Sequence, residues 1–240
     1  MSYKHSKARR AFDSAVKNAV GEALTIQRFP QVRAATSSSS SRLLGAYYVL
    51  VFAQLETYIG DIIEDSVTAM NLYSNNPRVW PESMLGYAIH QGSDIRQQYR
   101  SFAFTEDEGA IINLLGQVAQ KLISSNPSSP SVLLDAAHIL EKKKYPSPKN
   151  MPQLFRRLGF SNIFSSISRV ARTDSKLLLT SLNDLRTGIA HNGATPPAFS
   201  ARDFRDRARQ MSVFVAALDR VVATHFCQVM RRQQWNRTVT

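Results

Sequence analysis

The chain has 240 residues, 43% of them hydrophobic and 20% charged, and a net charge of +12, a balance typical of a soluble globular protein with one large domain or two small ones. The single cysteine, Cys227, excludes an intramolecular disulfide and a CxxC metal site, and the five histidines are scattered without HExxH spacing. We therefore expect no metal held by the protein and no cofactor.

The sequence also bears on where the protein resides. The longest uncharged run in the middle of the chain, residues 43–55, ends at Glu56 and is too short to span a bilayer. The N-terminal residues MSYKHSKARRAF lack the apolar core of a signal peptide. We therefore expect a cytoplasmic protein with no membrane partner.

Positive charge gathers near the C-terminal end. Eight arginines and no lysine or glutamate lie between Arg202 and Arg237. The planar guanidinium suits phosphate better than a point charge does, and a surface of this sign attracts phosphate polymers or anionic membranes. The alternative is a basic face that only meets solvent.

Helical periodicity runs through most of the chain, and no hairpin, βαβ alternation or internal repeat is present. The pattern predicts an all-α, up-and-down bundle decorated by shorter helices. We expect an N-terminal helix and connector over residues 1–36, packed as one compact unit with a helical domain over residues 37–240. The expected helices cover residues 6–28, 42–73, 81–99, 105–124, 131–144, 153–160, 174–192 and 201–231.

Local signals mark several helix ends. Thr105 with Glu108 and Ser200 with Asp203 have capping-box spacing, and Thr173 is placed to cap the helix that follows it. Gly159 and Gly193 are placed to end helices. The serines of residues 37–41 form either a flexible linker or an N-terminal cap.

Apolar residues at helical spacing define the faces that three of these helices turn inward. The inward residues are Leu44, Tyr47, Tyr48, Val51, Leu55, Ile59, Ile62, Ile63 and Val67 in the first, Leu178, Leu182, Leu185 and Ile189 in the second, and Phe204, Ala208, Met211, Phe214, Val215, Leu218 and Val222 in the third.

An arginine four to six positions before a histidine occurs twice, as Arg186–His191 and as Arg220–His225, whereas about one such match is expected by chance in a chain of this composition. The second pair lies in mid-helix, where an offset of five separates the side chains by roughly 140°. We interpret Arg220 and His225 as structural.

Arg186 and His191 have different surroundings, because His191 falls in the last turn of its helix, just before Asn192 and Gly193. A helix end can unwind and redirect a side chain, so the two residues are able to border one cleft. The alternative is an arginine on the solvent face and a histidine bonded to the final carbonyls.

The segment DLRTGIAHNG, residues 184–193, resembles the signature of the HEPN superfamily, in which an arginine precedes a histidine by four to six residues at a helix end. The earlier helix LLGAYYVLVFAQLETYIGDII, with its Leu55–Glu56 pair, and the segment RRLGF resemble the RiboL-PSP-HEPN-like branch. The resemblance covers about residues 42–226. One position departs from it: Thr187 stands where the family usually has Asn, Asp or His.

The resemblance implies a HEPN-type bundle and a metal-independent endoribonuclease, often a toxin or an antiviral effector. It implies that His191 transfers protons and Arg186 holds the phosphate. Asn192 is then placed to orient the histidine, Thr187 to offer a hydroxyl, and Glu56 to pair with the arginine.

The same resemblance implies RNA as substrate and a homodimer with a composite active site, and it suggests an antitoxin or defence-system partner protein. Arg202, Arg205 and Arg209 are the residues that we expect to bind RNA. A second interpretation stays open: a catalytically inactive HEPN-like module for dimerisation, nucleic-acid binding or partner binding.

Overall fold

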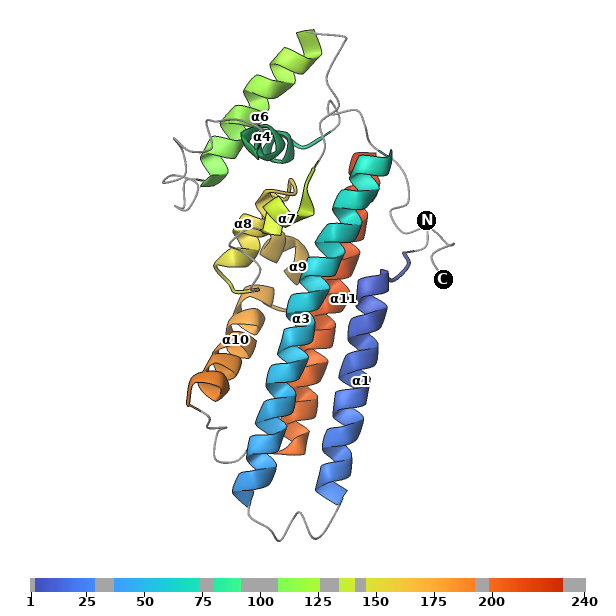
Figure 1. The fold of residues 1–240 in the computed structure, drawn as a ribbon, viewed down its shortest axis with the longest axis vertical. Coiled ribbons are helices and arrows are strands. Elements are labelled where there is room, and N and C mark those ends of the chain that lie inside the picture. Colours follow the sequence, from blue (N-terminus) through green and yellow to red (C-terminus); the bar gives the residue numbers. More distant parts are fainter. Residues whose placement is uncertain are drawn as a thin grey trace. The chain divides into compact units, whose positions relative to one another are not determined.

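The computed structural model describes residues 3–28, 37–73, 80–91, 108–125, 134–140, 146–192 and 199–230, and none of these residues lies in a strand (Figure 1). The predicted all-α helical bundle is therefore confirmed. The helices are α1 (Lys7–Arg28), α3 (Ser37–Tyr73), α4 (Glu82–Gln91), α6 (Glu108–Ser125), α7 (Ala136–Leu140), α8 (Asn150–Arg156), α9 (Ile163–Ala171), α10 (Ser175–Asn192) and α11 (Ala201–Met230).

The chain divides into two compact units. The first unit holds residues 62–166 and the chain from residue 222 onward, and the second holds residues 3–61 and 167–221. Helices α3 and α11 contribute residues to both units. The expected boundary between residues 36 and 37 stays a prediction, and α1 belongs to the second unit together with the first part of α3.

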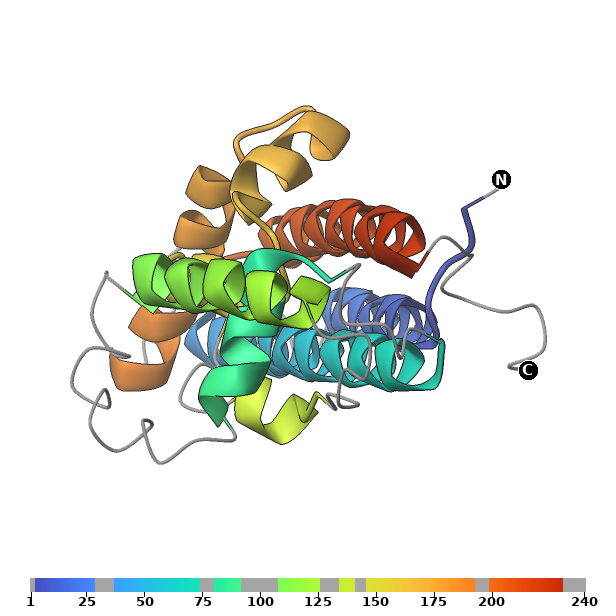
Figure 2. The same cartoon turned by 90° about the horizontal axis from the view of Figure 1, so that it is seen from above.

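The second unit is a bundle in which α1, α3 and α11 run beside one another, as both Figure 1 and Figure 2 show. Its core is built from large apolar and aromatic side chains. The rings of Phe12 on α1 and Tyr58 on α3 lie 6.1 Å apart between centroids. The side chains buried there include Phe12, Tyr48, Phe52, Leu55, Tyr58, Leu179, Leu182, Phe204 and Phe214.

A buried carboxylate on α11 joins the residues just before α1 to α3 and α11. Asp219 is fully buried and accepts hydrogen bonds from the hydroxyls of Tyr3, Ser6 and Tyr58, and also from the backbone N–H of Ser6 at 3.2 Å. Because a buried charge is costly unless donors surround it, these bonds are what make the position tolerable. Burial raises the pKa of both the Tyr3 and Tyr58 hydroxyls, so both remain protonated donors.

The first unit brings α4 and α6 together through glycine. A Cβ atom on Gly86 would lie 1.9 Å from the carbonyl oxygen of Ile112, and one on Gly116 would lie 1.8 Å from the carbonyl oxygen of Glu82. The two backbones thus approach too closely for any larger residue at either position. Gln120 strengthens the contact by donating from Nε2 to the Trp80 carbonyl at 3.1 Å.

The predicted inward faces are largely confirmed. All seven residues predicted on α11 are buried, and so are those on α3 except Tyr47, which is half-buried. On α10 the buried residues are Leu179, Leu182 and Ile189, whereas Leu178 and Leu185 are half-buried. The centre of that face is therefore rotated slightly from the predicted one.

Several helix ends differ from prediction. Thr173 does not cap α10: Asp174 does, by accepting the Leu177 N–H at 2.9 Å. Helix α9 was not expected, because the serines within IFSSISRVA obscure its apolar spacing. Helix α3 begins at Ser37, so the serines form its first turns and the linker interpretation is wrong.

Two predicted ends are confirmed. Ser200 and Asp203 form the expected capping box at the start of α11, with Asp203 N–H donating to the Ser200 hydroxyl at 3.2 Å and Ser200 N–H to the Asp203 carboxylate at 2.9 Å. Gly159 has a φ of 89°, which favours glycine after the end of α8. The predictions for Thr105, Gly193 and residues 92–99, 131–133 and 141–144 lie outside the described residues.

Segments of α3 and α11, Ser40–Leu72 and Ala201–Met230, are long and apolar enough to cross a membrane by length and composition alone. In the most apolar window of each, 44% and 56% of the residues are buried inside the protein. Core helices of soluble proteins pass the same test, and both helices carry a buried face here. The absence of a membrane partner stays a prediction.

The close contact between α4 and α6 gives a testable outcome. Gly86→Ala forces backbone against backbone, and we expect it to lower the free energy of unfolding by about 1–3 kcal/mol. The control is Gly21→Ala on α1, where no atom lies within 4 Å of the added Cβ. That change raises stability by about 0.5–1 kcal/mol, because alanine is the better helix former. Denaturant unfolding of both variants measures the difference, and equal effects contradict the packing argument.

Candidate functional site

Helix α10 is fixed at its start and along its inner face. Besides the Asp174 cap, Ser175 N–H donates to the Ser168 hydroxyl at 3.0 Å. One turn before Arg186, the Leu182 carbonyl accepts a bond of 2.7 Å from the buried Tyr48 hydroxyl on α3. In an α-helix that carbonyl also receives the N–H of residue 186. The hydroxyl of Tyr48 therefore holds the turn from which Arg186 projects.

Arg186 and Glu56 lie together, as the sequence predicted. The guanidinium Nη2 is 3.8 Å from the carboxylate Oε1, and the two side chains are 29% and 33% exposed. Burial raises the pKa of Glu56, while the charge of Arg186 opposes that rise. The ion pair is thus too long for a hydrogen bond and is open to solvent on one side.

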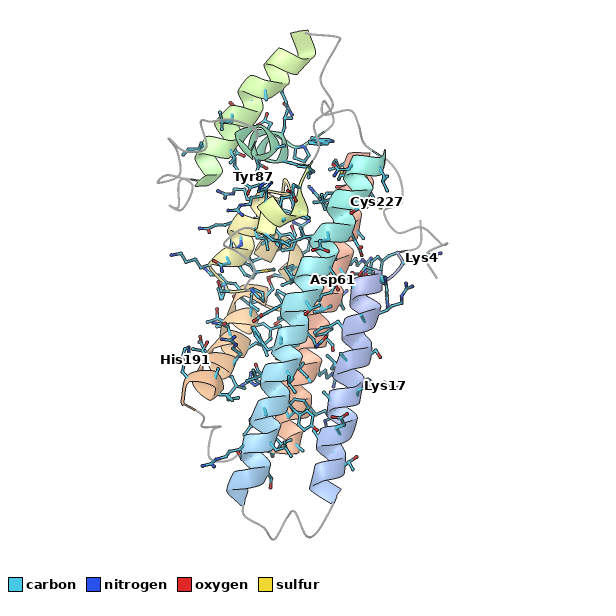
Figure 3. All side chains as sticks on the ribbon, in the orientation of Figure 1. Lys4, Lys17, Asp61, Tyr87, His191 and Cys227 are labelled. Carbon is cyan, nitrogen blue, oxygen red and sulfur yellow. The ribbon has the colours of Figure 1, made fainter. Side chains whose placement is uncertain are left out.

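His191 is exposed in the last turn of α10, and Figure 3 labels it. Helix α10 remains helical through Asn192, so no unwinding redirects His191 toward Arg186 within the helix. Five helical residues place two side chains roughly 140° apart around the axis and about 7.5 Å apart along it. A single copy of the helix therefore does not turn Arg186 and His191 to one face.

The helix surface next to His191 is not covered at Gly188. Thr187 is half-buried, and an added Cβ on Gly188 would meet no atom within 4 Å. Asn192 is the last residue of α10, and its predicted role in orienting the histidine stays a prediction. This exposed end of the helix is accessible to a nucleic acid or to a second protein.

The arginines predicted to bind RNA lie on the first turns of α11, where Arg202, Arg205 and Arg209 are all exposed. Arg205 forms a loose surface pair with Asp206 at 3.7 Å, which leaves most of its charge available to solvent. The pKa of Asp203 is lowered mainly by the Ser200 hydrogen bonds, so this helix also begins with an ionised carboxylate.

Sequence analysis did not single out Arg207, which faces α10 instead of solvent. Its Nη1 donates to the Ser181 hydroxyl and to the Gln210 side chain, each at 3.1 Å. The residue ties the basic end of α11 to the helix that carries Arg186. Nothing in the spacing separates it from its exposed neighbours, because the distinction arises only when α11 packs on α10.

The second Arg–His pair has the surroundings of a structural pair. His225 donates from Nε2 to the Leu158 carbonyl at 3.0 Å, and its ring lies 3.9 Å from that of Phe160 between centroids. Burial lowers its pKa, so the ring stays neutral. Arg220 is exposed on its own turn of α11.

Metal-binding groups are sparse in the part of the chain that the structure describes. Within those ranges no three His, Cys, Asp or Glu side chains cluster as ligands for one ion. His138 and Asp135 form a pair at 2.9 Å, which offers two ligands only. Cys227 is half-buried and free of any disulfide.

A sequence model of the RiboL-PSP-HEPN family matches residues 22–224. This match spans most of the chain and includes Glu56, Arg186 and His191, and the chain belongs to the RiboL-PSP-HEPN family. No curated protein and no solved structure gives a significant match.

Membership in the HEPN superfamily indicates an RNase-type or nucleotide-binding function. HEPN domains are commonly RNases, generally bind RNA and often dimerise. The all-α bundle and the position of the Arg–His motif at the end of α10 agree with this class.

The Glu56–Arg186 pair predicts a pH dependence of stability. Because the folded-state pKa of Glu56 is raised, its contribution is present below its ordinary pKa and is lost as pH rises through the raised value. Glu56→Gln should remove this loss, so its stability relative to wild type improves as pH increases. Arg186→Gln should steepen the loss, because the cation that opposes the rise is gone.

Denaturant unfolding at a series of pH values between about 4 and 7 measures both effects. Thr57→Ser, a neighbouring substitution on the same helix that carries no charge, is the control and should follow the wild-type pH profile. A Glu56→Gln variant whose relative stability declines with rising pH would show that the ion pair outweighs the burial cost.

Proposed function

We propose that the protein is a metal-independent endoribonuclease. The observation that carries the proposal is the arrangement of two side chains on α10. Arg186 lies beside Glu56 of α3, and His191 is exposed in the last turn of α10. Both residues lie within the family match. RNA supplies its own nucleophile, the 2′-hydroxyl, so the protein needs only proton transfer and charge stabilisation.

In the proposed reaction the 2′-oxygen attacks the adjacent phosphorus and the bond from phosphorus to the 5′-oxygen breaks. A base takes the proton of the 2′-hydroxyl, and an acid gives one to the departing 5′-oxygen. The products are a 2′,3′-cyclic phosphate and a 5′-hydroxyl. His191 is suited to either proton transfer, since an imidazole changes charge near neutral pH.

Arg186 binds the non-bridging oxygens of the crowded phosphorane. Glu56 holds this arginine only weakly. At 3.8 Å the pair lacks a direct hydrogen bond, and burial disfavours the charged form of Glu56. A phosphate group, which carries its charge on oxygens that accept two parallel bonds, therefore competes effectively for the guanidinium.

A composite site in a two-fold dimer supports both transfers. One histidine does not serve easily as acid and base on opposite sides of an in-line displacement. In addition, Arg186 and His191 diverge by roughly 140° on one regular helix. Two copies of α10 facing each other bring the arginine of one subunit near the histidine of the other.

The basic surface and the biological setting follow from the same proposal. Arg202, Arg205 and Arg209 attract the RNA backbone, and this attraction weakens with salt. The protein acts in the cytoplasm as a toxin or antiviral defence effector, restrained by an antitoxin or a defence-system partner, and needs no membrane.

The central prediction is cleavage of single-stranded or loop RNA in the presence of EDTA, with 2′,3′-cyclic phosphate ends. His191→Ala should reduce the rate by roughly 10²–10⁴-fold through loss of proton transfer. Arg186→Ala should have a comparable effect through loss of the phosphate contact. Single-stranded DNA should resist, because it lacks the 2′-hydroxyl.

Matched controls are His138→Ala and Arg169→Ala, which remove a histidine and an exposed arginine outside the site and should cleave within about twofold of wild type. Denaturing gels measure cleavage, and circular dichroism verifies folding. Activity that requires added metal, or that survives in His191→Ala, would overturn the mechanism.

The dimer prediction is tested separately. Sedimentation at micromolar concentration should show a two-fold dimer. Disulfide trapping through a cysteine placed at Gly188, where an added Cβ meets no atom within 4 Å, should link two copies across the facing α10 helices. A monomer under these conditions contradicts the composite site.

One observation favours the second candidate, a catalytically inactive HEPN module. Thr187 replaces the usual Asn, Asp or His after the arginine, and a hydroxyl is a weaker charge partner than those side chains. RNA that binds with salt-dependent affinity but is not cleaved, even with candidate activators present, would support that function.

A further inference from the structure

The first unit contains an open cavity of about 570 Å³ between the N-terminal turns of α4 and α6 and the end of α8. Its volume lies within the range of small-molecule sites. The polar side chains that line it are those of Glu82, Ser83, Asn113, Arg156 and Ser161. All of them belong to residues 62–166, whereas Arg186 and His191 belong to the other unit.

Arg156 is the one residue of the RRLGF segment, residues 156–160, whose side chain is not explained by packing in the core, and it lines the cavity. Arg157 is buried, donates to the Ile139 carbonyl at 2.7 Å and lies over the ring of Tyr87. The Leu158 carbonyl and the Phe160 ring both contact His225. Arg156 instead lines the cavity, and among the described residues none forms a hydrogen bond or ion pair with its guanidinium.

Two glycines shape the cavity around this arginine. The Arg156 side chain passes directly over Gly109, where an added Cβ would lie 1.7 Å from Nη1 and 2.7 Å from Cζ. On the other side, a Cβ on Gly159 would lie 2.5 Å from Pro81 Cγ, and its φ of 89° favours glycine. The guanidinium is thus positioned by close backbone contact and is not simply extended into solvent.

We propose that this cavity binds a nucleoside monophosphate. The guanidinium of Arg156 suits the phosphate, because its parallel N–H groups match two phosphate oxygens. A phosphate alone would leave Glu82 facing a like charge. A nucleoside supplies the hydroxyl and amino donors that the Glu82 carboxylate accepts, and groups that bond with the Asn113 amide and the two serine hydroxyls.

Isothermal titration with the four ribonucleoside monophosphates tests the proposal on the full chain. At least one should bind with a dissociation constant on the order of 10–100 µM. The matching nucleoside and inorganic phosphate should each bind roughly tenfold more weakly or worse, since each makes only part of the contacts. Equal affinity for inorganic phosphate would reduce the cavity to a simple anion site and overturn the assignment.

Substitutions locate the site. Arg156→Gln keeps the stem over Gly109 but removes the charge, and should weaken binding roughly tenfold or more. Gly109→Ala should also weaken nucleotide binding, because the added methyl would displace the guanidinium of Arg156. The fold should be retained, because only the far end of a flexible side chain has to move. Arg169→Gln, at an exposed position of α9, is the matched control and should bind like wild type.

A further variant separates this site from the proposed nuclease site. Arg186→Gln should retain nucleotide binding, so failure of the ribonuclease proposal leaves this one intact. Binding that survives in Arg156→Gln and disappears in Arg186→Gln would place the nucleotide at the α10 motif instead. No binding by any nucleotide would overturn the proposal outright.

Discussion

The contact between α3 and α10 is the constraint on which the functional end of the bundle depends. Tyr48 holds the Leu182 carbonyl from inside the bundle, and Glu56, two turns farther along α3, faces the guanidinium that projects from the next turn of α10. Both contacts come from α3, one as a hydrogen bond and the other as an ion pair. A shift of α3 by a single residue would misplace both, so the register of this helix pair is fixed by polar contacts as well as by apolar burial.

The two units solve different packing problems. In the second unit, large aromatic side chains fill the space between long helices, and a buried carboxylate surrounded by hydroxyls joins two of them. In the first unit, α4 and α6 approach through Gly86 and Gly116, so backbone meets backbone. The first arrangement tolerates small changes of side-chain volume better than the second, because side chains have rotamers and backbones do not.

The fold was predictable wherever apolar periodicity was long. The seven inward residues of α11 could be read from spacing alone, since thirty residues of one pattern leave no other interpretation. The pairing of Glu56 with Arg186 was also predictable, because an isolated carboxylate among apolar residues needs a cation. Helix α9 and the Asp174 cap were missed, because serine, threonine and aspartate suit caps, turns and short helices almost equally.

The hydrogen bonds to Asp219 make residues 3–6 more important for stability than their small number suggests. Tyr3 and Ser6 precede α1, yet they donate most of the hydrogen bonds to a carboxylate at the centre of α11. Loss of residues 3–6 would therefore leave the Asp219 carboxylate buried with few donors and weaken the packing of the helices around it. Removing these residues and following thermal unfolding would show how much their hydrogen bonds to Asp219 contribute to the stability of the bundle.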